Sequence, residues 1–258
     1  MNMQDIATSL KYYKTEVICF GFFMCLMLSL FSCKDEKLSA DTIIKNTVEA
    51  YGGEERWELI KQLSFDKKVT LFLEDGTVER ETNQFQLFQF NDAFGKIEWE
   101  ENAVEHQILF EKNKINKIEN DSALISQSDL NRAERAFFAS EYVIKQPFDL
   151  LRDDVILTRE TDTLINDKVC YVVSIAYKNE APDADRWYYI IDQSSFVILA
   201  NKVVLKDHTS WVENLTFDTE TDFRFNAHRK SYRLNEKGEK TYLRAEYFYS
   251  NYSVLLQE

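Results

Sequence analysis

The side chain with the clearest chemistry in this sequence is the thiol of Cys33, which follows an apolar run near the start of the chain. No residue between positions 17 and 31 is charged, Leu30 lies three positions before the cysteine, and the small residue Ser32 lies directly before it. This spacing is typical of a lipoprotein signal, in which the peptide bond before the cysteine is cleaved and the thiol is acylated. The pattern therefore predicts signal-peptide cleavage between Ser32 and Cys33 and lipid attachment at Cys33.

The length and flanks of the apolar run also indicate an export signal. The run is shorter than the about 20 residues that a membrane-spanning helix needs. Lys11 and Lys14 precede it, as in a cleavable signal. An uncleaved signal anchor is the alternative, because Asp5 and Glu16 offset the two lysines. Either outcome places the rest of the chain outside the cytoplasm.

The predicted anchor divides the chain into three parts. We predict a signal peptide over residues 1–32, a tether over 33–38 and a single β-rich domain over 39–258. Each buried methylene contributes about 0.8 kcal/mol to membrane binding, so an acylated Cys33 would hold the domain on a membrane. We expect an outer membrane lipoprotein of the cell envelope. Surface display is left open, because the charged residues 34–37 resemble both a surface-export motif and an ordinary linker.

No motif in the sequence predicts catalysis. The chain has three histidines, His106, His208 and His228. None forms a His-x-x-x-His or His-Glu-x-x-His pair, so no metal site is predicted. A Gly-x-Ser-x-Gly elbow and phosphate-binding glycine loops are also missing from the sequence. We therefore predict no catalytic residue and no cofactor, although Glu98, Glu100 and Glu101 around Trp99 leave a carboxylate-dependent hydrolase open as an alternative.

Charge and cysteine content narrow the class of partner. The formal net charge is −13, from 44 acidic and 31 basic residues. Because no basic stripe exists to collect phosphates, nucleic acid is excluded as a partner. Once the signal is removed and Cys33 is acylated, Cys170 is the remaining thiol, so no disulfide forms within the chain. Cys170 lies in the apolar run 169–175, where it is expected to act as a small buried hydrophobe.

The first part of the predicted domain changes from helical to strand periodicity. Ser39 caps a helix that Gly52 and Gly53 end, and a short helical piece covers 54–60. From Leu63 the apolar period becomes two, with Phe65, Val69, Leu71 and Leu73 on one face. Asp75 and Gly76 form a tight hairpin, and the return strand shows a pattern slip that predicts a β-bulge near Leu87.

The second part adds a helix and further strands. A helix is predicted from Ser128 through Tyr142, and Pro147 begins a short helical turn through Leu151. Strands joined by short turns favour antiparallel pairing, because parallel crossovers would need intervening helices. The fold class is therefore α+β and mostly antiparallel, with strands at 77–90, 96–100, 104–110, 115–119, 155–159, 169–177, 187–192, 196–205, 210–217, 230–234 and 241–250.

The order of glycines and aromatic residues resembles the lipoprotein-localisation-factor (LolA/LolB-like) superfamily. The likeness rests on an opening helix that ends at residues 51–53, Trp57 after it, a strand that begins at 63–65, a mid-chain helix, and the hairpin 187–198. The resemblance implies an incomplete antiparallel barrel whose curved sheet holds helices on its concave face. It also implies a pocket for acyl chains or another hydrophobic ligand between sheet and helices.

The aromatic residues of the strands are the candidates for lining such a pocket, although most aromatic side chains should fill the core. The candidate ligand-lining residues are Phe85, Phe88, Trp99, Trp187, Tyr189 and Trp211. The leading hypothesis is a non-catalytic, lipid-anchored envelope protein that binds an acyl chain or lipid, or that assists envelope assembly with a protein partner. The alternatives are a surface glycan-binding protein or hydrolase, and a scaffold that meets a partner through its acidic face.

Overall fold

A computed structural model describes residues 37–124, 126–181 and 184–257. The chain divides into two compact units, residues 1–38 and residues 39–258, and the architecture below is that of the second unit. The predicted cleavage and lipidation site at Ser32 and Cys33 lies outside the described residues.

The second unit is built on one antiparallel sheet of 14 strands among the described residues. The first six strands are β1 (Ile60–Phe72), β2 (Val78–Gln89), β3 (Phe94–Glu101), β4 (Val104–Glu111), β5 (Lys114–Glu119) and β6 (Ser122–Leu124). The last eight are β7 (Val155–Arg159), β8 (Thr163–Ile165), β9 (Lys168–Tyr177), β10 (Arg186–Asp192), β11 (Ile198–Val204), β12 (Thr209–Phe217), β13 (Asn226–Leu234) and β14 (Lys240–Leu256).

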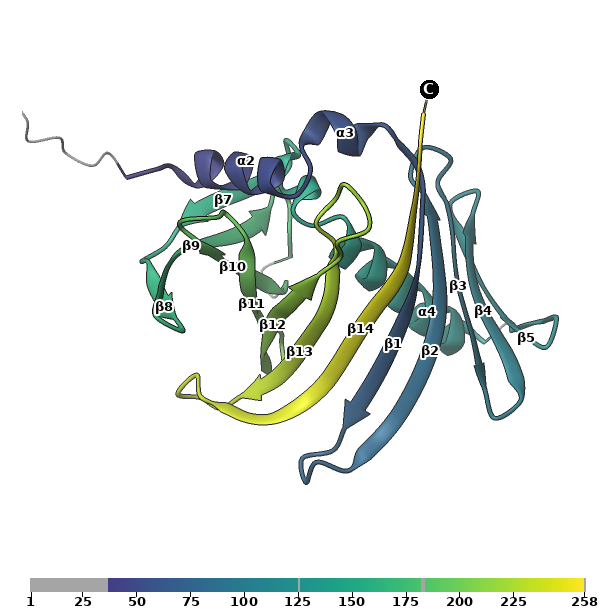
Figure 1. Cartoon of the computed structure of the whole chain (residues 1–258). Helices are drawn as coiled ribbons and strands as arrows, with labels where there is room; N and C mark the ends of the chain where they lie inside the picture. The colour runs from purple at the N-terminus through teal and green to yellow at the C-terminus, as the bar shows by residue number, and fades with distance from the viewer. Residues whose placement is uncertain (1–36, 125, 182–183, 258) are drawn as a thin grey trace, which may run out of the picture. The chain divides into compact units, whose positions relative to one another are not determined.

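The strand order is β6-β5-β4-β3-β2-β1-β14-β13-β12-β11-β10-β9-β7, with β8 paired beside β9. The first and last strands of the chain therefore meet in the middle of the sheet, where β1 pairs with β14. The sheet curves around α4 (Figure 1). This architecture confirms the predicted fold class, a curved antiparallel sheet with helices on its concave face.

The helices are α2 (Ala40–Ala50), α3 (Glu54–Glu58), α4 (Gln127–Ile144) and the short 3₁₀ turn η2 (Phe148–Leu151). The Ser39 hydroxyl caps α2 as predicted, because it accepts a hydrogen bond from the Thr42 amide at 3.1 Å. Gly52, with φ +127°, ends the helix, and a Cβ at this position would lie 2.7 Å from the Phe223 ring. Only glycine combines this backbone conformation with so close an approach.

Most predicted elements are confirmed, and three details differ. The short strands β6 and β8 were not expected, since three residues give no readable period. The predicted bulge near Leu87 is wrong. From Arg80 to Phe88, β2 pairs with β1 without a register shift, and its pairing with β3 shows no shift either. α4 also begins earlier than predicted, at Gln127 after Ser126.

Helix α4 packs closely against the concave face of the sheet. The Phe137 ring contacts the rings of Phe88 and Phe110, at centroid distances of 5.5 Å and 5.2 Å. Gly95 on β3 makes this packing possible, since a Cβ there would lie 2.6 Å from the Phe137 ring. A glycine in a strand often marks such a close approach. The helix is thus held at a fixed position over the inner face.

Candidate ligand-binding site

Alternate residues of a strand point to opposite faces of a sheet. We call the face toward α4 the inner face and the opposite one the outer face. Strand register places Lys67 of β1 directly opposite Gln84 of β2, and Gln84 directly opposite Trp99 of β3. We call these three inner-face residues the inner row. Tyr249 of β14 lies opposite Lys67 and extends the same row on its other side.

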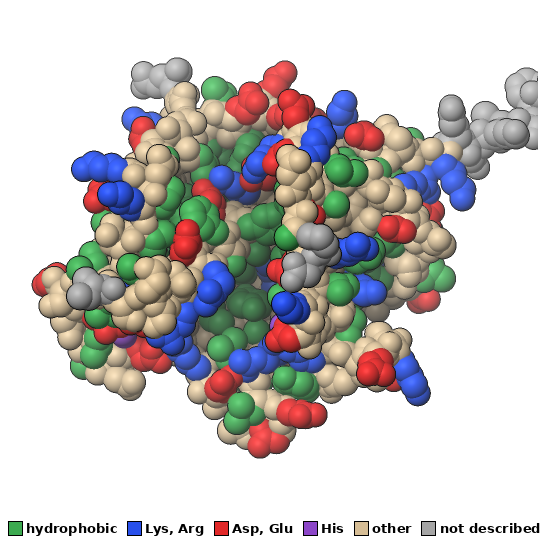
Figure 2. Space-filling model, turned by 180° about the vertical axis from the view of Figure 1, so that it is seen from behind, with side chains coloured by type: hydrophobic (Ala, Val, Ile, Leu, Met, Phe, Trp, Pro, Cys, Tyr) green, Lys and Arg blue, Asp and Glu red, His purple; other side chains and the backbone are tan. Residues whose placement is uncertain are grey.

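A cavity of about 280 Å³ lies between α4 and the inner face; we call it the inner cavity. Its lining is Lys67, Val69, Leu71, Arg80, Thr82, Gln84, Gln86, Ile97, Trp99, Ile108, Ala136, Ser140 and Tyr247. The rear view in Figure 2 shows a central hollow with hydrophobic side chains in its floor and lysine and arginine side chains around it. Apolar walls with a few placed polar groups are the usual composition of a small-molecule site.

The polar residues of the inner cavity form a hydrogen-bonded chain. The Lys67 ammonium lies 3.4 Å from Ser140 Oγ, and the Ser140 hydroxyl donates to Gln86 Oε1 at 2.6 Å. Gln86 Nε2 then donates to Gln84 Oε1 at 2.8 Å. Gln86 is fully buried, with 0% of its surface exposed. Its hydrogen bonds on both sides explain how a buried amide is tolerated.

Two cations lie next to Tyr247, a residue that lines the inner cavity. The Lys67 ammonium lies 5.6 Å from the centre of the Tyr247 ring, and Arg229 lies directly opposite Tyr247 on β13. Burial raises the pKa of the Tyr247 hydroxyl, and nearby arginines, Arg229 first among them, oppose that rise. Arg229 is only 6% exposed, and its Nε donates to Asn214 Oδ1 at 2.8 Å. No ion pair joins Arg229 to a carboxylate among the described residues.

A second charged cluster lies at the β3–β5 side of the cavity. Trp99 stacks on His106 with ring centroids 4.9 Å apart, and the Lys117 ammonium lies 4.3 Å from the centre of the Trp99 ring. Lys117 also contacts His106 Nδ1 at 3.0 Å and Glu119 at 3.6 Å. Burial lowers the pKa of Lys117, while Glu119 opposes the change. His106 is therefore a packed and hydrogen-bonded residue of the inner face.

A much smaller polar cavity, of about 20 Å³, lies beside Arg229. Its lining includes Trp187 and Tyr189, and the Tyr189 hydroxyl donates to Gln146 Oε1 at 2.8 Å. Gln146 Nε2 and Asn226 Oδ1 are buried and have no hydrogen-bond partner among the described residues. The cavity has room for about one water molecule.

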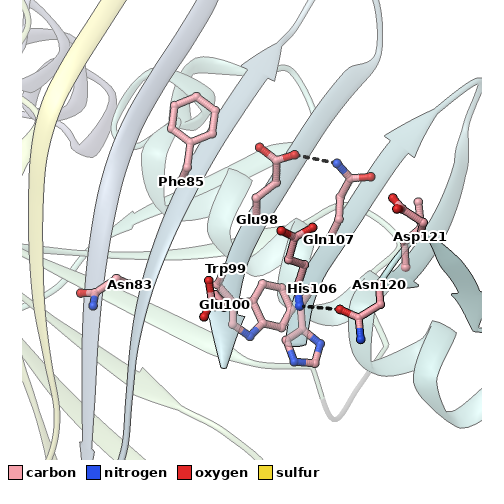
Figure 3. Close-up of a pocket in the computed structure, with 11 residues that line it drawn as sticks. Asn83, Phe85, Glu98, Trp99, Glu100, His106, Gln107, Asn120 and Asp121 are labelled. Atoms are coloured by element: carbon pink, nitrogen blue, oxygen red, sulfur yellow. Dashed lines mark hydrogen bonds between the residues drawn. The ribbon is translucent and has the colours of Figure 1, made fainter. Parts of the chain in front are cut away.

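The outer face carries a larger and more acidic depression, of about 510 Å³, which we call the outer hollow. It is lined by Asn83, Phe85, Glu98, Trp99, Glu100, Glu105, His106, Gln107, Ile118, Asn120 and Asp121. Figure 3 shows Glu98 beside Gln107, whose amide donates to the carboxylate at 2.7 Å. Lys96 also donates to Glu98 at 2.7 Å, and its ammonium lies 5.3 Å from the centre of the Phe85 ring. Glu100 lies directly opposite Glu105 across β3 and β4.

The six predicted ligand-lining residues separate into distinct places. Trp99 lines both the inner cavity and the outer hollow, whereas Trp187 and Tyr189 line the small polar cavity. Phe88 is 1% exposed and fills the core beneath α4. The other two predicted residues, Phe85 and Trp211, do not line the inner cavity. Phe85 lines the outer hollow, and Trp211 packs against the cluster of Cys170, Ile190 and Ala200.

Cys170 is buried as predicted, with 0% of its surface exposed. Its Sγ lies 3.5 Å from the Lys168 carbonyl oxygen, and burial raises the pKa of the thiol. A raised pKa and a buried position make the thiol a weak nucleophile. Within the described part of the chain, no group of three or more His, Cys, Asp or Glu side chains is placed to hold a metal ion.

Sequence reasoning missed the polar members of the inner cavity, namely Lys67, Gln84, Gln86 and Ser140. One signal was available, because Lys67 falls on the same strand face as Phe65, Val69 and Leu71. A lysine on the apolar face of a strand indicates a position where a charge meets something other than bulk water. Ser140 gave no such signal, since its partner Gln86 is 54 residues away in sequence.

No helix among the described residues has the length and apolarity to cross a membrane. No family model matches the chain, and a search of the curated proteins also gives no match.

Solved structures do show a common fold. A LolA superfamily protein from Nitrosomonas europaea aligns at 11% identity over 86% of this chain and 94% of its own, with a TM-score of 0.55. A DUF1329 family protein from Desulfovibrio piger aligns at 10% identity over 82% and 91% of the two chains, with a TM-score of 0.51. A domain from Vibrio parahaemolyticus, proposed to act in outer membrane lipoprotein sorting, aligns at 7% identity over 84% and 92%, also with a TM-score of 0.51.

The chain therefore has a LolA-like fold, as its resemblance to the lipoprotein-localisation-factor superfamily predicted. At these identities the likeness concerns the fold alone.

Proposed function

We propose that this chain is a lipid-anchored protein of the bacterial outer membrane that binds a hydrophobic ligand, an acyl chain or a lipid, in the inner cavity. The observation that carries the proposal is the cavity itself, about 280 Å³ between α4 and the inner face, walled by Val69, Leu71, Ile97 and Ile108. Its volume lies near the lower end of the range for ligand sites and suits one slender chain. Binding of this kind requires no catalytic residue.

Two further observations support this proposal. The predicted acylation of Cys33 would keep the cavity next to a membrane, where acyl chains are abundant. The domain from Vibrio parahaemolyticus, which has the same fold, is proposed to act in outer membrane lipoprotein sorting. An envelope protein partner that supplies or receives the ligand is compatible with this role.

Filling the cavity mouth provides the test of ligand binding. Ala136 is exposed on α4 and lines the inner cavity, whereas Ala139, one turn further along the same helix, is exposed and does not line it. The full chain in phosphatidylcholine nanodiscs is incubated with photoreactive hexadecanol, a neutral single-chain probe. We expect Ala136→Trp to abolish most of the saturable labelling and Ala139→Trp to leave it unchanged. Absence of saturable labelling of the wild-type chain both by this probe and by photoreactive palmitic acid and hexadecyl phosphate would refute ligand binding in the cavity.

The anchor is tested separately. We expect cells that express the chain to incorporate a clickable palmitate analogue into it, and Cys33→Ser to remove that label and to increase the apparent mass because the signal is retained. If the variant keeps the label, Cys33 is not the attachment site.

The outer hollow favours a second candidate function, binding of a surface glycan. It is larger than the inner cavity, and it combines carboxylates and amides, which can bind sugar hydroxyls, with the aromatic rings of Phe85 and Trp99. We expect a glycan ligand, if this role is correct, to shift amide resonances of β3 and β4 in the wild-type chain but not in Glu98→Ala. Shifts confined to the residues of the inner cavity would count against it.

A further inference from the structure

The polar groups that face the inner cavity are mainly hydrogen-bond donors. An ammonium has three N–H donors and no acceptor, so the contact between Lys67 and Ser140 uses the serine oxygen as acceptor. The Ser140 hydrogen is then committed to Gln86 Oε1. Beyond Ser140, the Lys67 ammonium contacts only the faces of the Tyr247 and Tyr249 rings, at 5.6 and 5.7 Å, so two of its N–H groups have no oxygen acceptor among the described residues.

The other two residues of the inner row, Gln84 and Trp99, also present hydrogen-bond donors to the cavity. Gln84 Oε1 is occupied by Gln86 Nε2, which leaves the Gln84 amide NH₂ group as the part able to contact a ligand. Trp99 has only one polar atom, Nε1, and this donor is buried without a partner among the described residues. Lys67, Gln84 and Trp99 therefore offer donors side by side on three neighbouring strands, spaced about 4.8 Å apart.

The cations beside Tyr247 lack negatively charged partners in the part of the chain that the structure describes, which also favours an anionic ligand. Lys67 forms no ion pair with a carboxylate among the described residues, and neither does Arg229 on the other side of Tyr247. Lys45 and Lys112, which also show no ion pair within the described ranges, are exposed to water, which solvates their charge. A half-buried cation without a counter-ion is best stabilised when a ligand supplies the negative charge.

We propose that the inner cavity selects an amphiphile with an anionic headgroup, a carboxylate or a phosphate, which accepts hydrogen bonds from Lys67, Gln84 and Trp99. The chain of the amphiphile then lies against Val69, Leu71, Ile97 and Ile108. This inference rests on the proposed function, since it requires that the cavity bind an acyl chain, and it adds the class of headgroup.

The test compares charged and neutral ligands of the same chain length. The full chain in phosphatidylcholine nanodiscs is titrated with photoreactive palmitic acid, hexadecyl phosphate or hexadecanol, at a pH where both anions are ionised. Lys67→Met keeps the length of the side chain and removes its charge. We expect this substitution to raise the half-saturation concentration of the anions about tenfold to 100-fold, the loss of one charge-assisted hydrogen bond. The value for hexadecanol is expected to stay unchanged.

Lys68→Met is the matched control, because Lys68 is the next residue of β1, points to the outer face and pairs with Glu81 at 2.9 Å. It removes the same charge and is expected to change none of the three titrations. Trp99→Phe removes the indole donor and keeps an aromatic ring, so it is expected to weaken anion binding by a smaller factor.

The outcomes separate the two proposals. If hexadecanol and the anions bind and Lys67→Met affects them equally, or not at all, the headgroup inference is wrong while the proposed function stands. If none of the three ligands labels the wild-type chain, both are wrong. A preference for palmitic acid over hexadecyl phosphate, or the reverse, identifies the headgroup among the two anions.

Discussion

The inner and outer faces of β2 and β3 are built from alternate residues of the same two strands, and they are chemically opposite. Inward, Gln84, Gln86 and Trp99 join Lys67 in a wall of donors beneath α4. Outward, Phe85, Glu98 and Glu100 contribute to a depression rich in carboxylates. Since the side chains of a strand alternate with period two, one sheet can carry two surfaces of opposite charge a few ångströms apart.

The difference between the faces is also one of burial. Inner-face polar groups are shielded by α4 and need a partner in the protein, as Gln86 has in Ser140 and Gln84, or a partner in the ligand, as we propose for Lys67 and Trp99. Outer-face carboxylates are in contact with water, which screens their repulsion. A substitution of the same kind should therefore change the free energy of unfolding strongly on the inner face and weakly on the outer face.

Two phenylalanines of β2 provide the largest expected contrast. Phe88 is 1% exposed beneath α4, whereas Phe85 is 36% exposed on the outer face. We expect Phe88→Ala to lower the free energy of unfolding by about 3–5 kcal/mol, because it leaves a cavity in the core. Phe85→Ala should cost about 1 kcal/mol or less. Urea denaturation measures the free energy of unfolding of both variants. Equal losses of stability would contradict the assignment of the two faces.

A buried hydrogen bond provides a contrast of intermediate size. Ser140→Ala leaves Gln86 Oε1 buried without its donor, so we expect a loss of about 1–3 kcal/mol. Gln107→Ala removes the amide that donates to Glu98 on the outer face, where water can replace it, and should cost about 0.5 kcal/mol. If Ser140→Ala is as mild as Gln107→Ala, the inner cavity is far wetter than the structure indicates.

The smallest expected effect is a stabilisation, whereas the substitutions above destabilise the protein. Glu100 and Glu105 lie directly opposite each other, and like charges in this position destabilise a sheet. We expect Glu100→Gln to stabilise the protein by about 0.5 kcal/mol in thermal unfolding at low salt, and by less at high salt. Glu101→Gln is the control, since Glu101 pairs with Arg80 at 2.6 Å and its neutralisation should not stabilise.

Local signals in the sequence predicted the elements but not their long-range partners. The capped helix after Ser39, its end at Gly52 and the hairpin at Asp75 and Gly76 depend on neighbouring residues, and all three are present. The pairing of β1 with β14 joins residues almost at opposite ends of the domain, as Leu63 and Val254 show. No local pattern encodes such a pairing, and it was not predicted.

The wrong bulge near Leu87 shows why the site was harder to predict than the fold. A strand was expected to place apolar residues inward, so Phe85 and Leu87 conflicted with Phe88. The structure resolves the conflict without a bulge, because the inner face of β2 is partly polar and Gln86 is buried on it. The inward polar residues that obscured the period are the same ones that give the inner cavity its chemistry.

The central claim, that a hydrophobic ligand occupies the inner face, is tested most directly by locating the ligand on alternate residues of the sheet. The wild-type chain in nanodiscs is labelled with photoreactive palmitic acid, and fragmentation mass spectrometry assigns the modified residues one by one. The account predicts modification at inner-face positions such as Ile97, Ile108 and Tyr247. Modification at Phe85, Leu87 or Glu98, with the inner positions unmodified, would contradict it.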